Sequence, residues 1–306
     1  MNIDNFLKNI EADVNAGLDH IEEVKALMPT IIDCPACEPD INLFPDGTAL
    51  ESPRAQLIYN SKGEFLGATG NRYESTQPKD LLDAFVKGFS EAGLPGDLSK
   101  LDYLLIRDGR MMLIRIPVAE FVLPGGDTTI IYLTIETGFA GYCSTRVSLY
   151  TYRLVCKNGM VVKGKGRDLF SAKHTERMNL QAIEWLNVLG GAYESIVANA
   201  EAWVKLKETP LTKQRRTSFV KNFFNIDQNQ SLSDLPTRTQ NRVDALQAAI
   251  SEEIEGPAES TLWGLLQGAT RYTNHYAERS GSEEYIIAMS GRRANDRAYA
   301  DVLSLV

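Results

Sequence analysis

The sequence has little cysteine and histidine and no long apolar segment. Four cysteines in 306 residues are too few for a disulfide-stabilised scaffold, so a reducing compartment is expected. No apolar run approaches the roughly 18–20 residues that cross a bilayer. The first residues contain neither the basic nor the apolar region of a secretory signal. We therefore expect a cytoplasmic protein without a membrane partner.

Familiar motifs of catalysis and nucleotide binding are also missing. The sequence contains no HExxH, GxSxG, Walker or dinucleotide-binding motif. Its three histidines are His20, His174 and His275, and sequence spacing gives none of them a catalytic partner. The sequence therefore predicts no catalytic residue and no cofactor. It favours a protein that is not an enzyme, and leaves a hydrolase that uses His174 or His275 as an alternative.

Two of the cysteines, Cys34 and Cys37, have CxxC spacing. A structural zinc site usually needs a second such pair. Cys143 and Cys156 would supply that pair only if folding brought them close. A redox-active CxxC normally opens a helix, whereas this one precedes a proline-rich segment. The sequence therefore predicts no metal site and gives the CxxC no defined role.

Acidic residues outnumber basic ones, with a formal net charge of −8 and a pI of about 5.1. This balance excludes a protein that coats nucleic acid with its whole surface. Residues 1–50 hold ten acidic residues against two lysines. Their apolar residues recur at helical spacing from Ile3 to Val24, which predicts a helix over residues 1–30. That helix either exposes a solvated acidic face or forms an arm that docks on a neighbouring subunit.

The segment from Tyr142 to Arg177 has the opposite charge, with eight basic residues and two acidic ones. An alternating apolar run from Val147 to Cys156 is followed by Lys157-Asn158-Gly159 and a second apolar run. Asn-Gly between such runs is the strongest short signal for a hairpin, because both residues tolerate positive φ. We therefore expect a basic hairpin in the middle of an acidic chain.

The remaining patterns predict short strands followed by helices. Prolines between Asp33 and Pro53 indicate an irregular linker. The predicted elements are a β meander over 55–77, a helix from about Pro78 to Gly93, strands over 101–106, 111–118 and 128–137, and helices over 173–207, 211–225, 238–254 and 261–278. The tail brings Arg292, Arg293 and Arg297 close together in sequence.

This order predicts an α+β fold, in which N-terminal and central hairpins build an antiparallel sheet and a mainly helical C-terminal half follows. With 43% hydrophobic residues, the chain can bury a sizeable core. We expect an acidic helix and linker over residues 1–54, a sheet with the basic hairpin and a long helix over residues 55–210, and a helical region over residues 211–306.

Three motifs together resemble a family of phage- and plasmid-encoded proteins described as domain of unknown function 932. They are Gly70-Asn71-Arg72-Tyr73 followed by Gln77, the run from Arg153 to Gly159 leading to His174-Thr175, and the run from Thr261 to His275. The family usually has threonine before Asn-Gly, where this chain has Lys157. The resemblance covers about residues 55–280. It implies an intracellular, mobile-element setting in a bacterial host and brings no catalytic residues.

The basic segment indicates an anionic polymer as partner. Glycines in Gly164-Lys165-Gly166-Arg167 let main-chain N–H groups approach a phosphate, and tyrosine rings on the alternating strand can stack on bases. The predicted contacts to single-stranded DNA are Arg146, Tyr152, Arg153, Lys157, Lys163, Lys165, Arg167, Lys173, His174 and Arg177. His174 has three interpretations, as a structural or capping residue, as a phosphate contact, or as a catalytic base.

A sheet with a basic hairpin and a following long helix is broadly similar to the single-strand annealing recombinases. This likeness suggests a role in recombination or replication and assembly into homo-oligomers. Two alternatives stay open. The hairpin can be a solvated basic surface, or the chain can be a non-enzymatic phage protein that self-assembles or binds another protein without binding nucleic acid.

Overall fold

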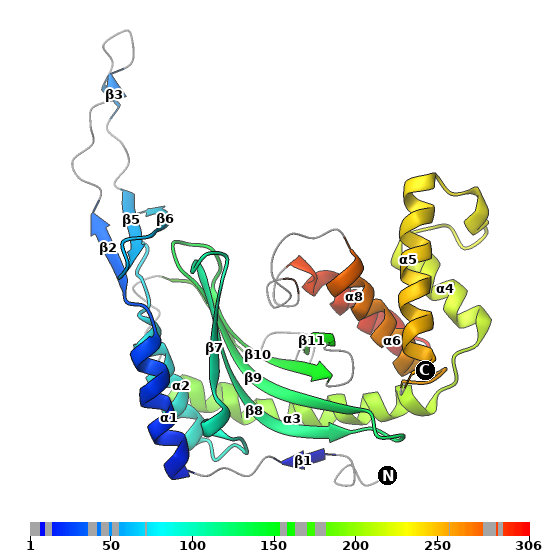
Figure 1. Ribbon diagram of the computed structural model, residues 1–306, viewed down its shortest axis with the longest axis horizontal. Coiled ribbons are helices and arrows are strands. Elements are labelled where there is room, and N and C mark those ends of the chain that lie inside the picture. The colour runs from blue at the N-terminus through cyan, green and yellow to red at the C-terminus, as the bar shows by residue number, and fades with distance from the viewer. Residues whose placement is uncertain are drawn as a thin grey trace.

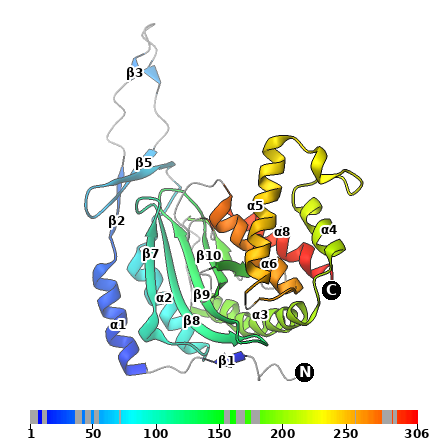
Figure 2. The same ribbon diagram turned by 45° about the vertical axis from the view of Figure 1, so that its right-hand side comes forward.

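The computed structural model is an α+β protein, as the sequence predicts, with antiparallel sheets followed by a helical C-terminal half (Figure 1). The structure describes residues 7–9, 14–35, 42–43, 49–50, 55–70, 72–153, 158–162, 170–174, 182–256, 258–277, 286 and 290–306. The C-terminal helices lie beside one end of the central sheet (Figures 1 and 2).

The central sheet is antiparallel and has the strand order β1-β8-β9-β10-β11, with β7 also paired to β8 and β12 to β10. Its strands are β1 (Leu7–Asn9), β7 (Asp102–Ile106), β8 (Met111–Val122), β9 (Thr128–Gly138), β10 (Thr145–Arg153), β11 (Asn158–Val162) and β12 (Phe170–Ala172). Tight turns join β7 to β8 and β8 to β9. In these turns Gly109 and Gly125 have φ of +77° and +90°, which favours glycine. The hairpins predicted at these glycines are confirmed.

The N-terminal sheet contains β2 (Ile31–Pro35), β5 (Ala55–Asn60) and β6 (Phe65–Gly70). A separate pair, β3 (Asn42–Leu43) and β4 (Ala49–Leu50), lies beyond this sheet and away from the central one (Figure 1). The irregular linker predicted from Asp33 to Pro53 instead begins with a strand, because Asp33 to Pro35 pair with β5. Proline is accommodated there because β2 is an edge strand.

Helix α1 covers Val14–Leu27, a shorter stretch than the helix predicted over residues 1–30. Leu7–Asn9 form β1 instead and pair with β8. Tertiary pairing with a long strand here outweighs the helical spacing of the apolar residues. Ile21 and Val24 of α1 are buried in the core of the chain, so this helix is not a free arm.

Strands β10 and β11 form the predicted hairpin, but its turn does not include the Asn-Gly pair. Asn158 is opposite Arg153 and Gly159 is opposite Tyr152, so both residues belong to β11. The connecting residues 154–157 lie outside the described part of the chain. Because β10 also pairs with β9 along its length, the direction of each β10 side chain is already fixed. The register of β11 therefore matches β10 rather than the turn preference of Asn-Gly.

The helices are α2 (Pro78–Glu91), α3 (Ala182–Glu208), α4 (Lys213–Phe223), α5 (Thr237–Ile254), α6 (Leu262–Arg271) and α8 (Arg292–Leu303), with 3₁₀ turns at Leu98–Lys100 and Leu232–Asp234 and a π-helical turn at Tyr272–Tyr276. The helix predicted from residue 173 begins at Ala182, and β12 ends just before residue 173. Thr212 and Thr261 cap α4 and α6 through their hydroxyls. None of the described helices is long and apolar enough to cross a membrane.

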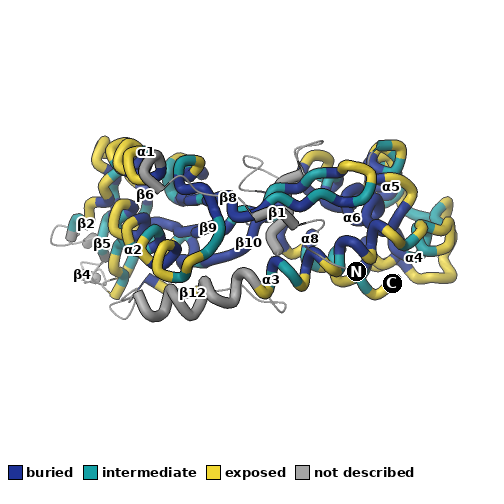
Figure 3. Tube along the Cα trace, turned by 90° about the horizontal axis from the view of Figure 1, so that it is seen from below, coloured by how far each residue is buried: buried dark blue, intermediate teal, exposed yellow. Residues whose placement is uncertain are grey.

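One hydrophobic core extends from α1 to α8. Helices α2 and α3 lie along one face of the central sheet and α1 lies beside β7 at its edge (Figure 2), and Figure 3 shows the strands β8, β9 and β10 largely buried. Trp203 of α3 connects the two halves, since its ring centroid lies 5.4 Å from that of Phe121 in β8 and 5.9 Å from that of Trp263 in α6. The division of the chain at residues 54 and 210 stays a prediction.

A buried carboxylate joins the opposite face of the sheet to the last helix. Glu136 of β9 is fully buried, and its Oε2 lies 3.5 Å from a guanidinium nitrogen of both Arg146 in β10 and Arg292 at the start of α8. Arg292 also donates to the hydroxyl of Ser148, at 3.4 Å. A buried charge is tolerated only when it is paired, so this cluster fixes α8 against the sheet.

We predict that Arg292→Met lowers the free energy of unfolding by about 3 kcal/mol, because it removes one of two cations from a buried carboxylate. The double variant Arg292→Met/Glu136→Gln removes the uncompensated charge as well and should recover part of this loss. Urea denaturation followed by circular dichroism measures both values. Strictly additive effects of the two substitutions would contradict the coupling.

Candidate anion-binding site

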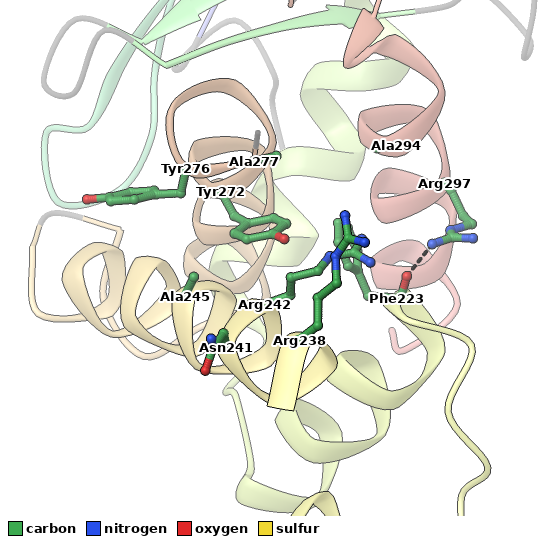
Figure 4. Close-up of a pocket in the computed structure, with 10 residues that line it drawn as sticks. All are labelled: Phe223, Arg238, Asn241, Arg242, Ala245, Tyr272, Tyr276, Ala277, Ala294 and Arg297. Atoms are coloured by element: carbon green, nitrogen blue, oxygen red, sulfur yellow. Dashed lines mark hydrogen bonds between the residues drawn. The ribbon is translucent and has the colours of Figure 1, made fainter. Parts of the chain in front are cut away.

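A pocket of about 570 Å³ lies among four elements of the helical half (Figure 4). The residues that line it are Phe223, Arg238, Asn241, Arg242, Ala245, Tyr272, Tyr276, Ala277, Ala294 and Arg297. They come from the end of α4, the first half of α5, the π-helical turn with the residue after it, and α8. Small side chains at Ala245, Ala277 and Ala294 leave the volume open.

Helical spacing places the pocket residues of α5 on one face. Arg238, Asn241, Arg242 and Ala245 recur at three- and four-residue steps, while the adjoining stripe, which includes Val243, Leu246 and Ile250, is buried in the core. Polar and apolar faces of this helix therefore have different surroundings. The apolar face holds α5 in place, and the polar face is left to line the pocket.

Three arginines give the pocket its charge. Arg238 and Arg242 project from α5 toward the space beside Tyr272, and Arg297 lies across from them on α8 (Figure 4). Among the described residues, no acidic side chain lines the pocket and no carboxylate forms an ion pair with any of the three. Like charges in proximity repel one another. The arrangement is therefore suited to a bound anion that would relieve this repulsion.

Aromatic side chains of α4 and its cap position two of these arginines. The guanidinium carbon of Arg242 lies 5.0 Å from the ring centroid of Phe224, and that of Arg297 lies 5.6 Å from the centroid of Phe223. Arg297 also donates to the main-chain carbonyl of Phe223 and, at 3.5 Å, to the side-chain oxygen of Asn225. Each guanidinium keeps further N–H donors for a ligand, because arginine has five.

The tyrosines of the π-helical turn form the aromatic part of the wall. Tyr272 is buried and contacts Phe223 and Phe224 edge-on, with centroids 5.8 Å and 5.9 Å away. Tyr276 is 44% exposed, and its hydroxyl donates to both carboxylate oxygens of Glu252 at 3.0 Å. Arg271 binds the same carboxylate at 2.8 Å, which compensates the negative charge of Glu252. The exposed ring of Tyr276 is thereby oriented at the pocket edge.

Sequence reasoning did not predict this site. Tyr272 belongs to the third family motif and Arg297 to the arginine cluster of the tail, but neither was predicted as a contact, and Arg238 and Arg242 were not singled out. The spacing of four residues between these two arginines, beside an apolar stripe, is the signal that would have found them. The convergence of α5 and α8 depends on tertiary contacts that no local pattern contains.

The predicted DNA contacts of the hairpin have mixed surroundings. Arg146 lies beside the buried carboxylate of Glu136, which it shares with Arg292. Lys173 is exposed. Tyr152 and Arg153 lie on β10 opposite Gly159 and Asn158, and their side chains are outside the described part. The remaining predicted cations lie outside the described residues: Lys157, Lys163, Lys165, Arg167 and Arg177. Their contacts to DNA stay predictions.

His174 is buried, with an exposed fraction of 6%. Its Nδ1 lies 3.3 Å from the hydroxyl of Thr76, its Nε2 lies 3.3 Å from that of Thr145, and its ring is stacked on Tyr73 with centroids 5.3 Å apart. Burial lowers the pKa of His174, which keeps the ring neutral. These surroundings favour the structural interpretation of His174, which joins the first family motif to the second.

The described cysteines do not gather into a metal site. Cys34 lies in β2 and Cys143 lies between β9 and β10, and both are free thiols. Burial raises the pKa of Cys143 to about 12, so this thiol is inert. The described part of the chain contains no group of three or more histidine, cysteine, aspartate or glutamate residues arranged to hold a metal ion. Cys37 and Cys156 lie outside it.

Comparison with protein families matches residues 65–301 to the family described as "Domain of unknown function (DUF932)". The chain belongs to this family. No curated protein and no solved structure matches the chain. The matched range contains the pocket and His174, so both are features of the DUF932 domain.

We predict that stability falls below pH 6.5 in part through His174. Its pKa is 6.5 when unfolded and lower when folded, so the unfolded chain takes up the proton first. The contribution is complete above pH 6.5 and is lost as the pH falls through the folded pKa. In His174→Asn, the free energy of unfolding should therefore fall less steeply between pH 7 and pH 5. An unchanged slope in chemical denaturation would contradict this assignment.

Proposed function

We propose that this DUF932 protein binds single-stranded DNA and that the pocket of Arg238, Arg242 and Arg297 binds a phosphate of the strand. The observation that carries this proposal is the convergence of these three guanidinium groups in one pocket, without a carboxylate partner among the described residues. Guanidinium forks match the geometry of phosphate oxygens, and a bound phosphate would offset the local repulsion.

The pocket also suits a nucleotide in size and chemistry. A volume of about 570 Å³ falls within the range of small-molecule sites. Single-strand binders combine cations that follow the backbone with aromatic rings that stack on bases. Tyr276 supplies an exposed ring at the pocket edge, and an unpaired strand leaves its bases free to reach it. The net charge of −8 favours such a localised site over a general basic surface.

The basic hairpin offers a continuation of this site. Strand β11 lies against α6 and α8, the helices that adjoin the pocket (Figure 1). A strand held at Arg297 of α8 therefore has a short route to the segment that carries the predicted hairpin cations. We propose that recombination or replication of a mobile element, in the cytoplasm of a bacterial host, is the setting of this binding.

We predict that Arg238→Ala/Arg242→Ala weakens binding to a fluorescent oligothymidylate by about 2 kcal/mol, roughly thirtyfold, because it removes two phosphate contacts. The logarithmic dependence of binding on salt should also decrease, by up to about two. Fluorescence anisotropy over a salt titration measures both. Lys62→Ala/Arg72→Ala, which also removes two exposed positive charges, is the matched control and should bind nearly as the native chain does.

The triple variant Lys163/Lys165/Arg167→Ala separates the pocket from the hairpin. Weaker binding in both variants supports one continuous site. A loss in the hairpin variant alone would assign DNA binding to the hairpin and remove the pocket from the proposal. If the native chain shows no binding at low ionic strength, DNA binding itself is refuted.

A second candidate function is self-assembly through the N-terminal sheet. Ile32, Tyr59 and Phe65 are opposite one another across β2, β5 and β6, and so share one face. Ile32 is 43% and Phe65 50% exposed, and the rings of Tyr59 and Phe65 lie 5.5 Å apart. Such an apolar row on a sheet face favours contact with a second copy.

If the chain self-assembles through this row, Phe65→Asp should shift its mass in solution toward the monomer, because a charge would be buried at the contact. Light scattering coupled to gel filtration measures the mass. Lys62→Asp, in the exposed turn between β5 and β6, is the control for added charge and should leave the mass unchanged. An equal mass for the native chain and Phe65→Asp would exclude this face as the contact.

A further inference from the structure

We infer that the arginine pocket binds a terminal phosphate monoester, at the end of a strand or on a free nucleotide, in preference to an internal phosphodiester. This inference rests on the proposed function, because it names which phosphate the pocket selects. The observation that supports it is that three arginines line a single pocket, which is formed by four elements.

The number of cations favours a monoester. A phosphodiester has one negative charge and two free oxygens. A phosphate monoester carries a charge of about −1.5 to −2 at neutral pH and three strong acceptor oxygens. Arg238, Arg242 and Arg297 supply three positive charges from two helices, and none of the described residues that line the pocket is acidic. A diester would leave most of this charge uncompensated, whereas a monoester would compensate more of it.

The start of α5 adds to the positive potential. Arg238 is the second residue of this helix, and Pro236 at the N-cap position provides no side-chain hydrogen bond to the first turn. The N-terminal end of a helix carries a partial positive charge from its unpaired N–H groups. This field acts on the same side of the pocket as Arg238, and it favours the group with the larger negative charge.

The four elements around the pocket leave a chain end a simple route into it. Its walls come from α4 and α5, from the π-helical turn, and from α8, which frame the space as Figure 4 shows. An internal phosphodiester requires the strand to pass both into and out of this frame. A terminal phosphate needs passage on one side alone, with the attached sugar and base directed outward past Tyr276.

Tyr276 provides a surface for the terminal base. Its hydroxyl is held by both oxygens of Glu252, so the ring is fixed while 44% of the residue remains exposed. Figure 4 shows this ring on the opposite side of Tyr272 from the arginines. Phosphate at the arginines and base at Tyr276 therefore define two ends of one nucleotide-sized site, in which stacking contributes about 1–3 kcal/mol.

The test compares oligothymidylates of one length that end in a 5′-phosphate, a 3′-phosphate or hydroxyls only. The native chain should bind one phosphorylated form at least about tenfold more tightly than the hydroxyl form, as expected for added charge-assisted hydrogen bonds. The form that binds more tightly identifies the end recognised. Thymidine monophosphate should compete for the site, and thymidine should not.

Variants assign the preference to the pocket. In Arg238→Ala/Arg297→Ala, the ratio of affinities for phosphorylated and hydroxyl oligonucleotides should fall to about one. Lys213→Ala/Arg293→Ala removes two exposed positive charges that do not line the pocket, and as the matched control it should keep the ratio. Thermal unfolding of each variant verifies that it is folded, and Arg238→Gln, which keeps the length and removes the charge, replaces any variant that is not.

The outcomes separate this inference from the proposed function. Equal binding of all three oligonucleotides, with a uniform loss in the pocket variant, overturns selection of the terminal phosphate and leaves DNA binding intact. Binding of thymidine monophosphate without any oligonucleotide binding, abolished in the pocket variant, supports the monoester site and refutes DNA binding. Absence of binding to every probe overturns both.

Discussion

The buried carboxylate of Glu136 is the constraint on which the two halves of this molecule depend. Side chains alternate along β9, so Glu136 lies on the opposite face from Ile135, which packs in the core with α2 and α3, and it meets cations from β10 and from α8. A charge with no access to water has few permitted geometries, so this cluster sets where α8 begins and how the helix is rotated. Arg292 and Arg297 lie five residues apart on that helix, and rotation that directs one toward the sheet directs the other toward the pocket.

Local sequence patterns predicted the elements whose structure does not depend on distant contacts. Hairpins at Gly109 and Gly125 follow from residues that tolerate positive φ, and amphipathic helices such as α2 and α5 follow from apolar spacing. Predictions failed where tertiary pairing decided the outcome. Leu7–Asn9 form a strand because an edge of β8 is available, and Asn158-Gly159 is strand rather than turn because β9 already fixes the faces of β10.

The candidate site was harder to predict for a related reason. Counting charges along the sequence identifies basic and acidic segments. It does not show which cations form ion pairs with a carboxylate from another element. Arg146 belongs to the most basic segment, yet its neighbour in space is Glu136, ten residues earlier on the next strand. Arg238 and Arg297 are 59 residues apart in sequence and line one pocket, and that convergence is a product of helix packing. Whether a surface is basic thus depends on which of its cations are paired with carboxylates in the folded chain.

The π-helical turn at Tyr272–Tyr276 has a consequence for how the pocket can change. The main-chain N–H of Ala277 bonds to the carbonyl of Tyr272, so this turn holds one residue more than an α-helical turn would. Loss of a single residue here would restore the ordinary repeat and rotate the following side chains by about 100° about the helix axis. Segment length, as much as side-chain identity, therefore determines which side chains line this part of the pocket, and an insertion or deletion here would change the lining without replacing any of its residues.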